Sequence, residues 1–350
     1  MTNGTQAAAN GRHIGIRVLA VFLAFVLVIS LLLVNETRVR IRQADGENAT
    51  AFANNYLYTN SDYAHLPAGE RLRRVLEQLG TQPGNQETLE YHYEESSIAI
   101  AQGKNEEALE HVDICLALID KSSAAYEELL MKQACLRALV EDYEGAQASF
   151  AKVLKLVPEN AQAWLLQTQL LIQAGDVTAA MNHLKQYLTL EEGDGGQLAV
   201  MAQLCFGSGE YSDTLEYGEK ALALIDDDAE FGELYRSMGY AAMLGDNSVD
   251  KAEAYLTSAI ERLDNNAEIY YYRGVYRMAI AQIPAALEDF NAAIDGGYET
   301  ALVYYNRGVC YLEQNDINAL RADMEKVAQL NEDQELTQIA LEIINELDKA

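Results

Sequence analysis

The side chains best suited to metal binding or nucleophilic chemistry in this sequence are five histidines and four cysteines. The histidines do not form the H-E-x-x-H motif, which places two imidazoles on one helix face. His111 and Cys115 stand one helical turn apart, but the helix register turns Cys115 inward and no further ligand lies nearby. The cysteines contain no C-x-x-C pair and are interpreted as small buried apolar residues. The sequence therefore predicts no metal site and no cofactor.

Glycine-rich and acidic segments also fail to predict a catalytic site. The glycines within residues 193–196 follow no expected strand, so a phosphate-binding loop is not predicted. The aspartates at 226–228 lack the alternating spacing of a calcium loop. Carboxylate pairs are so common among 54 acidic residues that no single pair indicates acid–base catalysis. We therefore expect a protein that is not an enzyme and has no small-molecule substrate.

The charge balance bears on the class of partner. The formal net charge is −29, whereas nucleic-acid binding depends on lysine and arginine side chains that displace counterions from phosphates. This charge excludes nucleic acid as an expected partner. Solubility is a sufficient reason for so acidic a surface.

The N-terminal region contains a long apolar segment. Residues 18–34 include Ser30 as the only polar member, and extension back to Ile14 gives 21 residues. That length suffices to cross a hydrocarbon core of about 30 Å as one helix. A cleaved signal peptide is the alternative, but no small-x-small cleavage site follows closely. We expect a tail at 1–13, a transmembrane anchor at 14–34 and a polar tether at 35–66.

The topology of this single-pass arrangement is not decided by charge. Arg12 and Arg17 precede the apolar segment, while Arg38, Arg40 and Arg42 follow it, so the positive-inside comparison is nearly balanced. The resemblance of the first residues to an uncleaved signal sequence favours the extracytoplasmic side for the rest of the chain.

An internal repeat accounts for most of the remaining sequence. Residues 127–160, 161–194 and 195–228 align without gaps as three segments of 34 residues. Within each segment, apolar or small residues recur at spacings that suit two amphipathic helices packed face to face. Four further copies are visible, at 89–122, 232–266, 267–300 and 301–334.

The residues of these copies resemble the tetratricopeptide pattern W-x2-L-G-x2-Y, A-x3-F, P. The matching residues include Ala146, Phe150, Pro158, Trp164, Ala180, Tyr270, Gly274, Ala286, Phe290, Tyr304, Gly308 and Tyr311. The resemblance implies an all-α fold, a right-handed α-solenoid of about seven helix pairs over 89–334. An entry helix is expected at 67–88. A capping helix is expected at 335–350, where apolar residues lie on one side only.

The resemblance also implies where a partner would bind. In this family the first helix of each pair lines a concave groove, and the matching positions here are apolar and aromatic. The expected partner-binding residues are Tyr93, Met131, Leu165, Phe206, Tyr240, Met243, Tyr271, Met278, Tyr305 and Leu312. The same stripe also has an explanation as plain helix packing, and both interpretations stay open at this point.

The expected function is a membrane-tethered scaffold that binds protein or peptide partners through this groove. The alternative is a structural subunit or assembly factor of an envelope or secretion complex. The basic clamp that some relatives use for a C-terminal carboxylate is not evident, because Arg236 is the only basic residue at the positions compared.

Overall fold

The computed structural model describes residues 86–225, 231–245 and 249–349. All regular elements of these residues are helices, fifteen in number, so the predicted all-α class is confirmed for them. The expected tail, anchor and tether, and nearly all of the entry helix at 67–88, lie outside the described residues. The helices belong to two compact units, with the boundary between Gln197 and Leu198, inside the first turn of α9.

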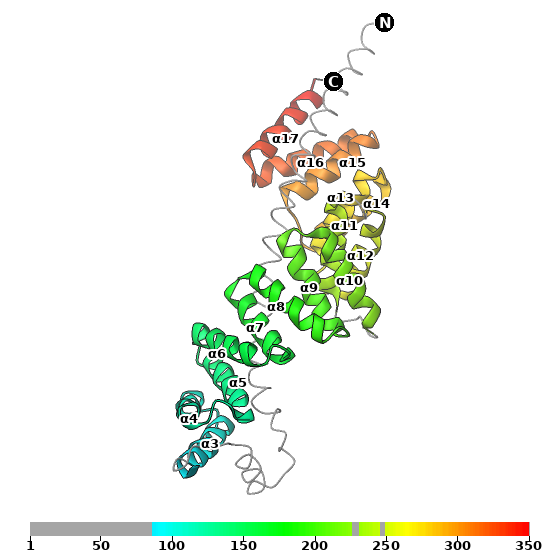
Figure 1. Cartoon of the computed structure of the whole chain (residues 1–350). Coiled ribbons are helices and arrows are strands. Elements are labelled where there is room, and N and C mark those ends of the chain that lie inside the picture. Colours follow the sequence, from blue (N-terminus) through cyan, green and yellow to red (C-terminus); the bar gives the residue numbers. More distant parts are fainter. Residues whose placement is uncertain (1–85, 226–230, 246–248, 350) are drawn as a thin grey trace. The chain divides into compact units, whose positions relative to one another are not determined.

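The N-terminal unit contains three helix pairs, in which each helix packs against the next along the chain (Figure 1). Its helices are α3 (Gln86–Ala101), α4 (Asn105–Leu118), α5 (Ala124–Leu139), α6 (Tyr143–Leu156), α7 (Ala161–Ala174) and α8 (Val177–Leu190).

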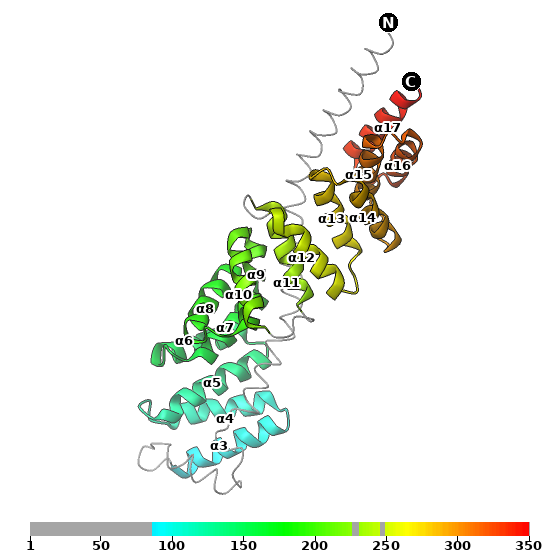
Figure 2. The ribbon, with the colours of Figure 1, turned by 90° about the vertical axis from the view of Figure 1, so that its right-hand side faces the viewer.

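The C-terminal unit continues the same order and ends on a single helix. Its helices are α9 (Gly195–Ser208), α10 (Tyr211–Leu224), α11 (Gly232–Leu244), α12 (Val249–Arg262), α13 (Ala267–Ala279), α14 (Ile283–Asp295), α15 (Ala301–Glu313), α16 (Ile317–Leu330) and α17 (Gln334–Leu347). The first helices α11, α13 and α15 contact one another in sequence, and both ribbon views show α13 beside α15 (Figure 2).

Short polar caps and left-handed turn residues set the helix boundaries. Asn160 accepts a hydrogen bond from the amide of Ala163 at 2.8 Å at the start of α7, and Asp176 caps α8 in the same manner. Between these two helices, Gly175 adopts φ +79°, a conformation that costs glycine no steric energy. The turn is therefore tight enough for α8 to fold back on α7.

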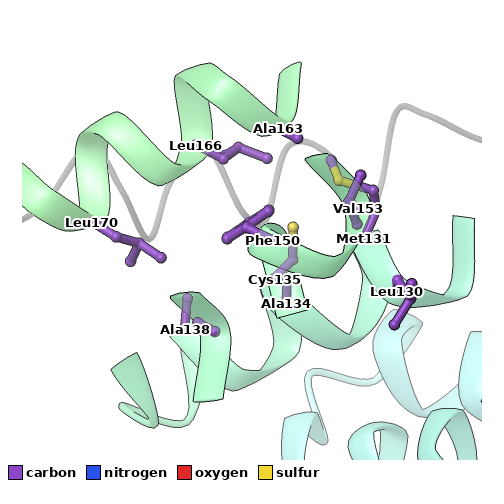
Figure 3. Close-up of a cluster of buried hydrophobic side chains, with 11 residues drawn as sticks. Leu130, Met131, Ala134, Cys135, Ala138, Phe150, Val153, Ala163, Leu166 and Leu170 are labelled. Atoms are coloured by element: carbon purple, nitrogen blue, oxygen red, sulfur yellow. The ribbon is translucent and has the colours of Figure 1, made fainter. Parts of the chain in front are cut away.

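Neighbouring pairs share one interior, as the cluster in Figure 3 shows. Phe150 of α6 is 1% exposed and lies in a cluster with Cys135 of α5 and Leu166 of α7. Because α7 belongs to the next pair, each pair buries apolar surface that it cannot cover alone. Burial of a side chain as large as phenylalanine contributes roughly 1.5–3 kcal/mol.

Small residues allow the two helices of a pair to approach closely. A Cβ atom at Gly274 of α13 would lie 2.9 Å from Cε1 of Phe290 in α14, closer than packed carbon atoms tolerate. The last helix, α17, packs its apolar side onto α16, and its Leu336, Ala340 and Ile343 are buried. This is the packing that a capping helix requires.

Candidate partner-binding surface

The ten predicted groove residues all lie on first helices of the repeats, but the structure divides them by exposure. Seven are buried, namely Tyr93, Met131, Leu165, Phe206, Tyr240, Tyr271 and Tyr305. The other three, Met243, Met278 and Leu312, are partly exposed. A side chain must reach solvent in order to contact a partner. The three partly exposed residues are therefore better candidates for partner contact than the seven buried ones.

Tyr93 is held in the N-terminal unit by charged neighbours. Its hydroxyl donates to the Glu128 carboxylate at 3.0 Å and accepts from the Lys132 ammonium at 2.7 Å. The same ammonium lies 4.3 Å from the centroid of the Tyr93 ring. Burial lowers the pKa of Lys132, but Tyr93 and Glu128 together raise it above its ordinary value. Lys132 is therefore a fixed, paired cation that ties α5 to Tyr93 on α3.

The buried tyrosines of the C-terminal unit pack on one another across successive first helices. The ring centroids of Tyr240 and Tyr272 are 4.8 Å apart, and those of Tyr271 and Tyr272 are 5.0 Å apart. Asn306 of α15 donates a hydrogen bond to the Tyr271 hydroxyl at 3.1 Å. Burial raises the pKa of Tyr305 to about 12, so its hydroxyl is neutral near pH 7. These rings serve as core for the C-terminal unit.

The three partly exposed residues share one position in the repeat. Met243, Met278 and Leu312 each stand twelfth in their copies, in the last turns of α11, α13 and α15. Because α11, α13 and α15 contact one another in sequence, we expect these equivalent positions to form an apolar line across the C-terminal ends of the helices. Leu312 also packs in part against the buried cluster of α15, α16 and α17. Flexible methionines at a surface adapt to the shape of an apolar partner.

A polar layer between paired helices was missed by the sequence reasoning. The seventh residue of a repeat copy faces the residue that stands sixteen positions later in the chain. In the copy at 267–300 these two residues are Arg273 and Asp289, and Arg273 donates two hydrogen bonds to Asp289, at 3.0 and 2.7 Å. Arg273 also donates to Thr257 of the preceding pair at 2.9 Å. The signal was available in the sequence, because Arg307 and Asp323 recur 34 residues later.

The basic and thiol groups of the described residues are largely occupied or buried. Arg236 is 5% exposed and forms an ion pair with Glu233, so it is not a free anion-binding group. All four cysteines are reduced and buried. Burial raises the pKa of Cys115 to about 12 and that of Cys310 to about 12, which leaves both thiols protonated and unreactive near pH 7.

One group of possible metal ligands gathers at the turn between α9 and α10. Ligand atoms of Cys205, Glu210 and Asp213 all lie within 4.8 Å of one another. Cys205 is 0% exposed, while Glu210 is at the surface. Exposed acidic groups commonly gather without an ion, so this group indicates no site by itself.

Within the described ranges, no helix combines the length and the apolar character needed to span a bilayer. The predicted anchor at 14–34 falls outside those ranges.

Comparison with known proteins supports the repeat assignment. Residues 139–204 and residues 274–319 match models of the tetratricopeptide repeat family. Neither of these models describes a catalytic domain. No curated protein matches the chain.

Several solved structures align with parts of the chain. The C-terminal part of a TPR repeat-containing protein from Cytophaga hutchinsonii matches with a TM-score of 0.53 at 13% identity, covering 70% of this chain and 97% of that one. YrrB, described as a TPR protein with an unusual peptide-binding site, has a TM-score of 0.49 at 20% identity over 56% of this chain and all of its own. PilF of Pseudomonas aeruginosa has a TM-score of 0.45 at 12% identity, over 61% of this chain and 95% of its own.

The Cytophaga structure agrees with the described helix pairs. At 13% identity, this likeness bears on the fold alone. The two family matches and the stacking of helix pairs together support tetratricopeptide-like repeats in this chain.

Proposed function

We propose that this protein is a membrane-tethered scaffold that binds protein partners along the C-terminal ends of its first helices. The observation that carries the proposal is the line of Met243, Met278 and Leu312, which are partly exposed on three neighbouring helices. An amphipathic helix or an extended apolar peptide suits such a line, because its apolar side chains recur at a regular spacing.

The buried aromatic residues of the predicted groove support this surface rather than contact the partner. Tyr240, Tyr271 and Tyr305 are at most 3% exposed, so they fix the spacing of α11, α13 and α15. A surface held by packed rings loses little conformational entropy when it binds. The predicted groove therefore has a rigid aromatic base and a small set of adaptable contact residues.

The proposed tether is the apolar segment at 14–34, with the repeats on the extracytoplasmic side. Attachment to a bilayer raises the local concentration of the scaffold for partners that share the membrane. Weak contacts along a short apolar line are then sufficient for association. Alkaline extraction of membranes tests this part: the full chain should stay with the bilayer, and a chain that lacks residues 1–34 should be released.

The partner surface is tested by crosslinking in intact membranes, with identification of the captured protein. Met278→Glu and Leu312→Glu place a charge on the apolar line and should reduce capture of that protein severalfold. The matched control is Leu224→Glu on α10, because Leu224 is an exposed leucine of a second helix, 50% accessible to solvent. Equal loss of capture in the control, or no loss in the first two variants, would contradict the proposal.

A further inference from the structure

Two histidines face each other across the first described helix pair. His92 lies on α3 and His111 on α4, and their Nδ1 atoms are 2.7 Å apart. The ring centroids are separated by 5.0 Å, and both side chains are partly exposed to solvent. At this separation the two nitrogens share a single proton, so one imidazole donates and the other accepts.

Imidazole nitrogen is a common protein ligand of zinc, and two such nitrogens already point to one place here. An ion bound by both would take the place of the shared proton. With Zn–N bonds of about 2.0–2.1 Å in tetrahedral geometry, the two nitrogens would stand about 3.3 Å apart. The present pair therefore needs only about half an ångström of separation, which small rotations of two partly exposed rings supply.

Two neighbours, Glu95 and Tyr91, set the charge and the packing around the pair. Glu95 is one helical turn beyond His92 on α3, and its charge acts on the His92 ring. The Tyr91 ring packs edge-on against both imidazoles, with centroid separations of 5.2 and 6.3 Å. Cys115 is excluded as a ligand, because it is fully buried with its thiol directed to the backbone carbonyl of Leu89.

We propose that His92 and His111 form a binding site for a divalent transition-metal ion, with zinc as the first candidate. Water completes the coordination, and the charge of the nearby Glu95 carboxylate favours a cation at the pair. An ion held there joins α3 to α4 and so stabilises the first described pair, since a ligand that binds the folded chain alone shifts the unfolding equilibrium.

The test is a calorimetric titration of the full chain with zinc chloride near neutral pH and at physiological ionic strength. The wild-type chain should bind one equivalent at this site, and His92→Gln and His111→Gln should each weaken that binding at least tenfold. His183→Gln is the matched control, because His183 packs against Trp164 in another pair and should leave zinc binding unchanged. Circular dichroism without zinc establishes that each variant is folded.

X-ray absorption at the zinc edge of the wild-type chain gives a second, variant-independent reading. Scattering from two imidazole rings is expected, together with oxygen ligands. The proposal is overturned if zinc binds the two variants as tightly as the wild type, if no saturable binding occurs, or if the spectrum contains oxygen ligands alone. The first of these outcomes would place the ion on other carboxylates or on the cluster at Cys205.

Discussion

The guanidinium of Arg307 donates two hydrogen bonds to the carboxylate of Asp323, 3.0 and 2.7 Å long, and one repeat earlier Arg273 does the same to Asp289. In both cases the arginine is on a first helix and the aspartate on the second helix of the same pair. The carboxylates are almost fully buried, at 5% and 3% side-chain exposure. A bidentate pair of this kind fixes the relative position of the two helices.

Replacement of Asp323 by alanine should lower the free energy of unfolding by roughly 3 kcal/mol, because it leaves a half-buried guanidinium without its partner. The double variant Arg307→Met with Asp323→Leu should lose much less, since both charges are removed together. Urea unfolding followed by circular dichroism measures both. Asp348→Ala is the control, because its ion pair with Arg321 is exposed and should contribute under about 1 kcal/mol. A similar loss of unfolding free energy in Asp323→Ala and Asp348→Ala would contradict the larger contribution expected of the buried pair.

The same seventh position holds a glutamine in two other copies, with opposite surroundings. Gln133 interacts with Asp113 and with Ser149, whereas the Gln167 carbonyl oxygen is buried with no partner among the described residues. Gln167→Met should therefore raise the free energy of unfolding by about 1 kcal/mol, because it removes an unsatisfied buried group. Gln133→Met should lower it by about 1–3 kcal/mol, because it leaves its partners unsatisfied. Thermal unfolding compares the stability of the two variants with that of the wild type. An increase in stability for Gln133→Met would contradict the interactions described for Gln133.

Acid should weaken the fold through two histidines. Burial is the main cause that lowers the pKa of His92 and of His183 from the ordinary value of 6.5. The folded chain then favours neutral rings, so their contribution to stability is complete above 6.5 and is lost as the pH falls through the lower folded pKa.

The corresponding measurement is urea unfolding of the wild-type chain and of the double variant His92→Gln, His183→Gln between pH 7 and about 5. The stability of the wild type should fall more steeply, since the carboxylates common to both chains titrate alike. Parallel pH dependence in the two chains would show that neither ring is linked to folding.

The capping helix should be needed for the last pair. Removal of residues 333–350 uncovers the cluster that α15 and α16 share with Leu336, Ala340 and Ile343. Loss of the two larger side chains alone should cost at least about 3 kcal/mol. Differential scanning calorimetry should then resolve an earlier transition for the C-terminal unit. Leu341→Ser is the control, because Leu341 is 42% exposed and its loss should leave that transition in place.

Much of the fold could be predicted because the repeat period and the helix starts depend on residues that are close together in the sequence. The first helices α7, α9, α11, α13 and α15 begin at the residues where the predicted copies begin. Asn160 and Gly175 mark the ends of α7 by capping and turn chemistry that act over a few residues. The predicted copy at 127–160 starts three residues inside α5, because Ser123 caps that helix earlier.

The division of the groove residues could not be predicted from position alone. Tyr271 is covered by the rings of Tyr272 and Tyr298, and Tyr298 lies outside the repeat pattern. Whether a tyrosine on a first helix is exposed therefore depends on neighbours that the motif does not specify. The contact of His92 with His111 could have been predicted from the repeat. Trp164 and His183 occupy the same two repeat positions in another copy, and their ring centroids are 5.0 Å apart.

The most direct test of the scaffold proposal places a photo-crosslinking amino acid at single positions of the full chain in living cells. Substitution at Met243, Met278 or Leu312 should give adducts with the same partner protein, whereas substitution at Leu224 on a second helix should give none. Adducts with that partner from Leu224 alone, or no common adduct from the three first-helix positions, would contradict the proposed binding surface.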